Sequence, residues 1–343
     1  MSTEAARPVT AGASMMTLGK ALNSGLRRAM QDDPRVVVLG EDVGSLGGVF
    51  RITDGLQRDF GSARVVDSPL AESAIVGCAI GLALRGFRPV CEIQFDGFVY
   101  PAFDQIVSQL AKMRARSGGR LSLPVVIRIP AGGGIGAVEH HSESNEAYFA
   151  HTAGLRVVSC SNPSDAYRLL RSAILSDDPV IFFEPKRRYW DKGPVDLDAS
   201  PASLDRARVL RTGSDVTVVA HGPTVHTALA AAEAAAEDGF SVGVVDLRTI
   251  APLDMETLRR CAERTGRMVV VHEASSFMGI GAEIAAAVTE SCFSALHAPV
   301  MRVGAYNLPY PPAKVEDDFL PDVDRLLDTI DAALSYGKRP PHE

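Results

Sequence analysis

Short apolar runs alternate with segments of helical periodicity along the chain, and this alternation restricts the fold more than any other feature. Strands are predicted in the first half at residues 35–39, 64–66, 89–95, 125–129, 156–159 and 180–183. Helices are predicted among them at residues 15–30, 67–84, 102–116 and 164–175. Because a helix between two strands lets those strands run parallel, the first half is predicted to form an open, largely parallel α/β sheet.

The alternation restarts after a segment rich in proline, glycine and charge. Further strands are predicted at residues 215–220, 241–246, 268–272 and 300–303, with helices at 225–237 and 322–334. A chain of 343 residues is long enough for two domains with separate cores, and a single domain is the alternative. We expect a flexible arm (1–14), a first α/β domain (15–190), a linker (191–207) and a second α/β domain (208–343).

Glu72 opens an otherwise uncharged apolar helix. Ser68 is placed to be the N-cap and Pro69 the first helical residue, so Glu72 is expected in the first or second turn, near the positive end of the helix. Gly77 and Gly81 leave little bulk and predict close packing against other backbone, within the domain or at a subunit contact. Two interpretations stay open for Glu72, because a helix-start carboxylate can simply stabilise the helix or can serve a buried site.

Composition argues against several classes of function. The formal net charge is −7 and the basic run at residues 186–188 is short, so no nucleic-acid partner is expected. The longest uncharged apolar run, residues 73–84, is too short for a membrane span, and the first residues lack the layout of a secretory signal. Five cysteines without a CxxC pair argue against disulfides and zinc, and predict a reducing, cytoplasmic location.

The sequence GGGIGA at residues 132–137 follows a strand and loosely fits the dinucleotide-binding fingerprint. The acidic residue that should follow the next strand is absent, because that strand ends in Ser159-Cys160, so nicotinamide binding is disfavoured. Neither a Walker A sequence nor a Gly-Asp-Gly that could hold a magnesium diphosphate occurs. Another chain is therefore expected to hold the phosphates of any phosphorylated cofactor.

His140 and His141 lie in the same loop. Adjacent histidine side chains are expected to point apart, and no third ligand follows at a regular interval, so a metal site is disfavoured. A loop histidine suits proton transfer because imidazole titrates near neutral pH, and the alternative is an ordinary surface residue.

Phe98 and Gln94 lie at the end of the strand predicted at residues 89–95. Phe98 can form one wall for a flat heteroaromatic ring, with Gln94 hydrogen-bonding nearby, although core packing is the simpler interpretation.

Several blocks together resemble the beta subunit of 2-oxoacid dehydrogenases. The first-half blocks are GEDVGSLGGVFR (40–51), DSPLAESAIVG (67–77), EIQFDGFVYPAFDQI (92–106), HSESNEAYFAH (141–151) and DPVIFFEPKRRY (178–189). In the second half, SDVTVVAHG, VVDLRTIAPLD and HEA resemble the C-terminal domain of the same family. The resemblance covers residues from about 17 to 334. Within the family, the sequence most resembles the branched-chain form, 3-methyl-2-oxobutanoate dehydrogenase.

The resemblance implies a thiamine-diphosphate enzyme with two alpha and two beta subunits, in which alpha holds the magnesium diphosphate and beta holds the aminopyrimidine. Glu72 matches the catalytic glutamate of the family, Leu70 and Phe98 match positions that contact the pyrimidine, and His141 matches a histidine linked to acyl transfer onto the lipoyl arm of an acyltransferase core. The alternatives are a pyruvate or acetoin dehydrogenase beta subunit and, outside the enzymes, a scaffold subunit.

This sequence departs from the family pattern at two positions near the implied site. Phe98 stands where branched-chain relatives can carry tyrosine, which keeps the ring but loses the hydroxyl. Glu143 replaces the glutamine of the HSQS form and is expected to place a charge beside His141. No set of side chains in the sequence establishes a structural potassium ion.

Overall fold

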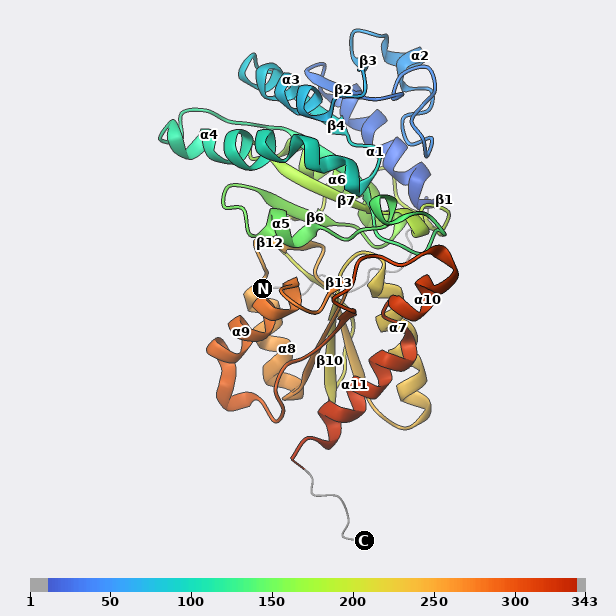
Figure 1. The fold of residues 1–343 in the computed structure, drawn as a ribbon, viewed down its shortest axis with the longest axis vertical. Helices are drawn as coiled ribbons and strands as arrows, with labels where there is room; N and C mark the ends of the chain where they lie inside the picture. The colour runs from blue at the N-terminus through green and yellow to red at the C-terminus, as the bar shows by residue number, and fades with distance from the viewer. Residues whose placement is uncertain (1–11, 338–343) are drawn as a thin grey trace.

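The computed structural model describes residues 12–337, so most of the predicted arm lies outside the described residues. The first domain is built on a seven-stranded sheet with the order β12-β6-β7-β5-β4-β2-β3 (Figure 1). Its parallel strands are β2 (Val36–Gly40), β3 (Val65–Asp67), β4 (Arg88–Glu92), β5 (Val126–Ala131), β6 (Arg156–Ser159) and β7 (Val180–Pro185). The predicted open parallel sheet is therefore confirmed.

Alternate residues of these strands face two different helical layers. Val38, Val90 and Phe182 pack with helices α1 (Leu18–Asp32) and α6 (Pro163–Leu175) on one face. Cys91 and Ile127 belong to the cluster on the other face, where the helical elements are α3, a mixed helix and α5. Their bounds are α3 (Glu72–Leu84), η1 (Asp96–Ala102), η2 (Gln105–Leu110), α4 (Ala111–Arg116) and α5 (Glu146–Ala150), with α2 (Leu56–Phe60) near β3.

The second domain has a five-stranded sheet with the order β14-β13-β10-β11-β9. Strands β10 (Val216–Ala220), β11 (Val242–Asp246), β13 (Met268–Ser275) and β14 (Met301–Ala305) run parallel, and β9 (Arg208–Arg211) is antiparallel. Helices α7 (Thr224–Glu237) and α11 (Val323–Ser335) cover one face, and α8 (Met255–Thr265) and α9 (Ile280–Cys292) cover the other. The short helix α10 (Glu316–Phe319) follows a surface loop.

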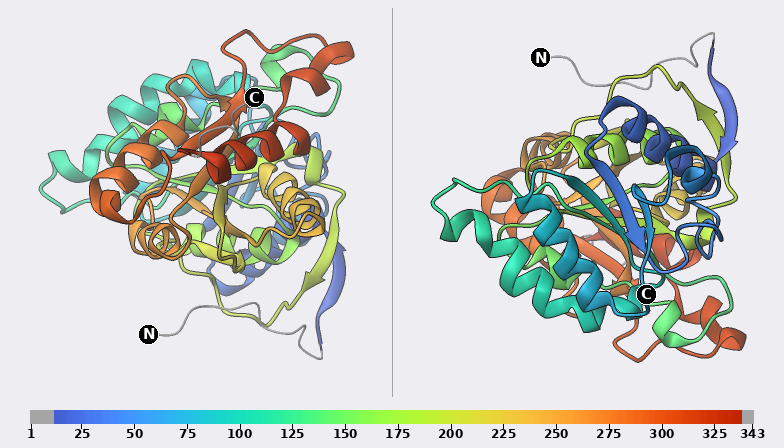
Figure 2. Two further views of the ribbon diagram at one scale, coloured as in Figure 1. Left: turned by 90° about the horizontal axis from the view of Figure 1, so that it is seen from below. Right: turned by 90° about the horizontal axis from the view of Figure 1, so that it is seen from above.

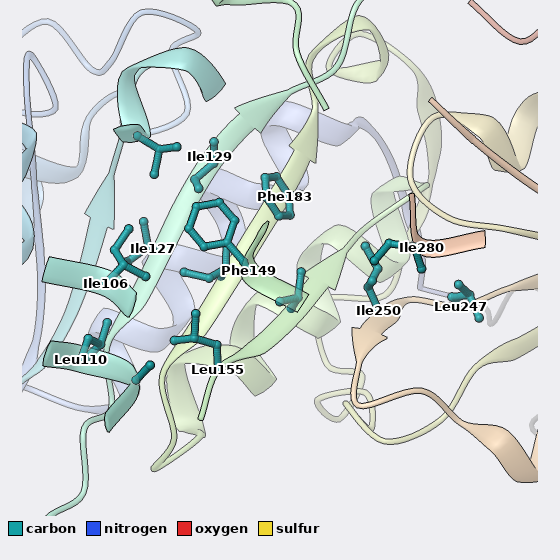
Figure 3. Close-up of a cluster of buried hydrophobic side chains, with 14 of the residues drawn as sticks. Ile106, Leu110, Ile127, Ile129, Phe149, Leu155, Phe183, Leu247, Ile250 and Ile280 are labelled. Atoms are coloured by element: carbon teal, nitrogen blue, oxygen red, sulfur yellow. The ribbon is translucent and has the colours of Figure 1, made fainter. Parts of the chain in front are cut away.

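The two domains share one apolar core. Strand β12 (Thr249–Ala251) leaves the second domain and pairs antiparallel with β6 of the first sheet. Ile127 and Phe149 from the first domain and Ile250 and Ile280 from the second belong to one buried cluster (Figure 3). The burial of apolar side chains across the junction holds the domains together as well as folding each of them.

Three details differ from the sequence expectations. Helix α3 begins at Glu72 with Ala71 as its N-cap, so Ser68 is not the cap and Pro69 is not helical. Residues at the start of the first predicted helix instead form β1 (Ser14–Thr17), which pairs with β8 (Lys192–Val195) inside the predicted linker (Figure 2). The helix predicted at 102–116 contains a π-helical segment. No helix within residues 12–337 is long and apolar enough to cross a membrane.

Candidate active site

Three polar residues lie just beyond the carboxyl ends of neighbouring strands. Glu41 follows β2, Gln94 follows β4 and Glu72 follows β3 after a short loop, and β2 pairs with both of the other strands. Ligands of open parallel sheets bind outside this edge, in crevices between loops. The sheet order therefore gathers the predicted residues Glu72 and Gln94 at one place that suits a ligand.

Glu72 is a buried carboxylate without a partner. It is the first residue of α3, only 9% exposed, and within the described residues its side chain makes no hydrogen bond or ion pair. The charge of Glu72 acts on Glu41, whose pKa is raised mainly by burial and further by Asp42 and Glu72. Carboxylates that crowd together without a cation favour a ligand that can share a proton with one of them.

Gln94 and Leu70 offer complementary surfaces near this carboxylate. The Nε2 of Gln94 is 3.5 Å from the backbone oxygen of Glu41, at the limit of a hydrogen bond. Leu70 precedes α3 and is 65% exposed, which is high for a large apolar side chain. An acid, an amide and an apolar wall fit the nitrogens and the face of an aminopyrimidine ring, and they do not resemble a phosphate or metal site.

Phe98 and His141 meet in an aromatic cluster. The ring of His141 stacks on Phe95 with centroids 3.9 Å apart and 17° between the planes, and it meets Phe98 edge-on at 5.1 Å. Phe50 contacts the same Phe95 ring at 5.5 Å. The predicted pair Phe98 and His141 therefore forms one surface, although no contact joins His141 directly to Glu72 in this part of the chain.

Two expectations about the histidine loop were wrong. The rings of His140 and His141 do not point apart but lie 4.4 Å from each other, because the short 3-10 helix Glu139–His141 turns both toward the aromatic cluster. Glu143 does not pair with His141, since its Oε2 accepts a hydrogen bond of 2.6 Å from the Tyr100 hydroxyl. The Nδ1 of His141 instead lies 3.0 Å from the backbone oxygen of His140.

Buried charges beneath the aromatic cluster were missed by the sequence analysis. Arg128 on β5 is fully buried and donates to Glu92 on β4 at 2.7 Å and to both oxygens of Glu184 on β7 at 2.7 and 2.9 Å. A second buried pair joins Lys186 to Asp96, where burial raises the pKa of Asp96 to about 7 against the opposing effect of Lys186. Asp96 follows Phe95 in the chain, and the Nζ of Lys186 lies 5.6 Å from the centre of the Phe95 ring. The buried ion pairs therefore hold the strand ends next to Phe95.

The glycine-rich loop does not bind a dinucleotide in this arrangement, because its amides are already occupied. The N–H of Gly133 donates to Oε1 of Glu273 at 3.0 Å, and the N–H of Gly136 donates to Oε1 of Glu316 at 2.8 Å. A pyrophosphate would have to displace these carboxylates from the same donors. The nicotinamide hypothesis therefore fails on geometry as well as on the missing acidic residue.

Glu146 and His221 face each other across the domain boundary. Oε1 of Glu146 lies 3.6 Å from Nε2 of His221, and neither atom has a hydrogen-bond partner. They line a cavity of about 20 Å³, large enough for one water molecule, together with Glu184 and Glu273. Burial raises the pKa of Glu146 to about 7 and lowers that of His221 to about 3, so His221 is uncharged near neutral pH and Glu146 changes its charge there.

Replacing Glu146 with glutamine is expected to change the pH dependence of stability. The ordinary pKa of 4.5 rises to about 7 on folding, so the folded chain binds this proton more tightly and loses stability as pH rises through that window. Between pH 5 and pH 8 the variant should gain on the order of 2 kcal/mol relative to the wild type. Urea unfolding at both pH values measures this, with the exposed Glu139→Gln as control; parallel wild-type and variant pH profiles would contradict it.

No group of three or more His, Cys, Asp or Glu side chains among residues 12–337 is arranged to hold a metal ion. All five cysteines are free thiols in the structure. The edge near Glu72 thus offers donors and walls for a ring.

Comparison with known proteins identifies similar sequences and folds. The family descriptions "Transketolase, pyrimidine binding domain" and "Transketolase, C-terminal domain" match residues 14–191 and 205–326. The chain is 59% identical to a pyruvate dehydrogenase E1 component subunit beta from Leifsonia xyli subsp. xyli, over 92% of this chain and 94% of that protein. It is 53% identical to a 3-methyl-2-oxobutanoate dehydrogenase subunit beta from Mycobacterium tuberculosis, over 93% and 92%.

A solved structure has the same fold. It is titled "Split gene transketolase, inactive beta4 tetramer", and it matches with a TM-score of 0.78 over 93% of this chain and 98% of that chain. The sequence identity is 23%, so the likeness extends to the fold and not to individual side chains.

Proposed function

The chain belongs to the family of 2-oxoacid dehydrogenase E1 beta subunits, as its motifs suggested, and we propose that it is the beta subunit of a cytoplasmic branched-chain 2-oxoacid dehydrogenase. Enzymes of this family depend on thiamine diphosphate. The observation that carries the proposal is the unpartnered carboxylate of Glu72 at the carboxyl edge of the first sheet, beside Gln94 and Glu41. A scaffold subunit would have no need for a buried acid without a partner.

Each residue near this edge has a role that follows from its chemistry. When bound, thiamine diphosphate would supply a nucleophilic carbon and an electron sink for decarboxylation of the 2-oxoacid. Glu72 would hold a proton at a ring nitrogen of the aminopyrimidine and so control the protonation of its amino group. Leu70 and Phe98 would pack against the ring, and the carboxamide of Gln94 would orient it.

His141 is suited to the second half of the reaction. Its ring is fixed by stacking on Phe95, and its loop lies on the surface, where a lipoyl arm from an acyltransferase core could approach. Imidazole can give a proton to a sulfur atom as the dithiolane opens and the acyl group is transferred. We therefore assign decarboxylation chiefly to Glu72 and acyl transfer to His141.

An alpha subunit is required by the proposal for two reasons. The sequence contains no Gly-Asp-Gly that could hold a magnesium diphosphate, so a second chain would supply that site. Helix α3, which has no charged side chain after Glu72, also lies at the periphery of the first domain beside α4 (Figures 1 and 2), where it borders an apolar groove of about 710 Å³. An apolar helix normally buries its surface, so we expect the alpha subunit to cover this groove. Because Glu72 is the first residue of the same helix, the subunit that covers the groove would also complete the cofactor site.

Gly81→Leu is expected to prevent assembly of the alpha-beta heterotetramer without unfolding the chain. A Cβ at Gly81 would meet nothing within 4 Å, and one at Gly77 would reach only Gln105, so these glycines are not close-packing points inside the domain. Leucine would therefore project into the space that the alpha subunit needs. Light scattering measures the mass, and Ala332→Leu on the exposed face of α11 is the matched control. A heterotetramer of unchanged mass and stability would refute the contact.

Substrate choice separates the main proposal from the second candidate, a pyruvate dehydrogenase beta subunit, which the relative at 59% identity supports. The branched-chain proposal rests on the motifs at residues 92–106 and 178–189 and on the relative at 53% identity. Two extra buried carbons contribute about 1.6 kcal/mol, or roughly tenfold in specificity. Competition between 3-methyl-2-oxobutanoate and pyruvate on the assembled enzyme decides between them. An equal or higher specificity constant for pyruvate would favour the second candidate.

A further inference from the structure

The loop that carries His141 is anchored to the C-terminal domain near its start. Besides the bonds from Gly133 to Glu273 and from Gly136 to Glu316, the N–H of Gly134 lies 3.2 Å from Oε2 of Glu316 and 3.2 Å from the Tyr310 hydroxyl. Tyr310 in turn donates to Oε2 of Glu316 at 2.7 Å. The successive amides therefore surround two carboxylates in the manner of an anion-binding nest.

The glycines make this arrangement possible. Gly132, Gly134 and Gly136 have φ angles of 86°, 79° and 71°, in the region that favours glycine. A Cβ at Gly133 would overlap the hydroxyl and ring of Tyr310, and one at Gly132 would lie 2.9 Å from Oε2 of Glu273. The backbone is shaped to the carboxylates and the tyrosine of the other domain, and a side chain at these positions would separate them.

The far end of the same loop is also held. The backbone oxygen of Asp96 accepts a hydrogen bond of 3.0 Å from the side chain of Asn145, and Glu146 meets His221 of the C-terminal domain at 3.6 Å. The N–H of Gly132 donates to the oxygen of Glu143 at 2.9 Å, which closes the loop on itself. His141 thus lies between two anchored ends and stacks on Phe95 in the middle.

We propose that Glu316, together with Tyr310 and Glu273, forms a carboxylate clasp through which the C-terminal domain positions His141. Hydrogen bonds from amides to a carboxylate are stronger than those between neutral groups. In the clasp these bonds hold a loop in place and do not stabilise the core. Glu316 is a positioning residue, because it acts on His141 only through the glycine amides. The catalytic part of the inference rests on the proposed role of His141 in acyl transfer.

The test uses the variants Glu316→Ala and Tyr310→Phe with Asp317→Ala as the matched control, since Asp317 lies next to Glu316, is exposed and makes no contact of this kind in the described chain. Hydrogen exchange of residues 132–146 in the full-length chain is the first readout. We expect exchange in this segment to become at least tenfold faster in Glu316→Ala, less so in Tyr310→Phe, and to stay unchanged in the control. Unchanged exchange in both clasp variants would overturn the proposal.

Activity of the assembled enzyme is the second readout. Acylation of a lipoyl domain should fall about tenfold in Glu316→Ala, while carbon dioxide release with an artificial electron acceptor falls by less than a factor of two. Equal loss of both activities would overturn the positioning role and indicate general disruption. Faster exchange with full lipoyl acylation would overturn the claim that the clasp positions His141, whereas the acyl-transfer role of His141 itself stands or falls with the His141→Ala variant. Tyr310→Phe keeps the test valid if Glu316→Ala does not fold.

Discussion

Glu72→Gln should lower the rate of 2-oxoacid decarboxylation by the assembled enzyme about a thousandfold, within the range expected when an acid-base group is lost. The carboxylate is buried at the first turn of α3 and has no partner within the described chain, so its interaction is available to the ligand. Glutamine keeps the size and polarity of the side chain but cannot exchange a proton. Single-turnover release of carbon dioxide from 3-methyl-2-oxobutanoate measures the step directly.

The matched control for this prediction is Glu283→Gln. Glu283 is also in the first turn of an apolar helix, α9, but it is exposed and lies in the second domain, so its replacement should leave turnover unchanged. If Glu72 served only to stabilise the start of α3, both variants would lose a similar, small amount of stability and keep their activity. Full activity of Glu72→Gln would remove the basis of the assigned function.

His141→Ala should separate the two halves of the reaction. Loss of its proton transfer is expected to slow acylation of a lipoyl domain at least a hundredfold, whereas decarboxylation with an artificial acceptor should change less than threefold. The reason is spatial, because His141 stacks on Phe95 in the surface loop and does not contact Glu72 in the described residues. Stopped-flow measurement of lipoyl acylation and steady-state acceptor reduction give the two rates.

His140→Ala is the control for that result, since the two rings are 4.4 Å apart and the neighbour has a more exposed position. It should keep both rates near those of the wild type. A similar loss of both half-reactions in His141→Ala would make the histidine a general active-site residue. Loss of acyl transfer in His140→Ala but not in His141→Ala would transfer the role to the neighbour.

The central strands of the first sheet could be predicted within about two residues because both of their faces are buried. The strands Val126–Ala131 and Val180–Pro185 are apolar apart from Arg128 and Glu184, and this composition is typical of a strand that is buried on both faces. The start of α3 was predicted wrongly, because Ser68 continues the sheet edge and donates its N–H to Gly40 at 2.9 Å. The helix can begin only when the chain has left that edge, at Glu72.

Short strands that owe their existence to tertiary pairing were not predictable. Thr249–Ala251 forms a strand only because β6 of the other domain lies beside it, and Ser14–Thr17 forms one only against Lys192–Val195. Their sequences carry no periodicity long enough to distinguish a strand from a loop. Helix and strand propensities describe local preference, and these segments are determined by distant partners.

The candidate site was partly visible in the sequence. Glu72 and His141 stand out as a lone carboxylate and a loop histidine, and the topology of a parallel sheet predicts that the loops after its strands meet. Glu316, Tyr310 and Glu273 were not predictable, because they act on glycine amides from more than a hundred residues away in the chain. The glycine spacing at residues 132–136 was a real signal of anion binding, but the anions are carboxylates of the same chain.

The most direct test of this account is calorimetric titration of thiamine diphosphate with magnesium into the chain alone and into its complex with the alpha subunit. The edge near Glu72 offers a ring site, and the sequence has no Gly-Asp-Gly for a magnesium diphosphate, so we expect no tight binding to the isolated chain and tight binding to the assembled enzyme. Glu72→Gln in the same complex shows how much of that binding depends on the buried carboxylate. Tight binding to the isolated chain, equal to that of the complex, would contradict a cofactor site shared between two subunits.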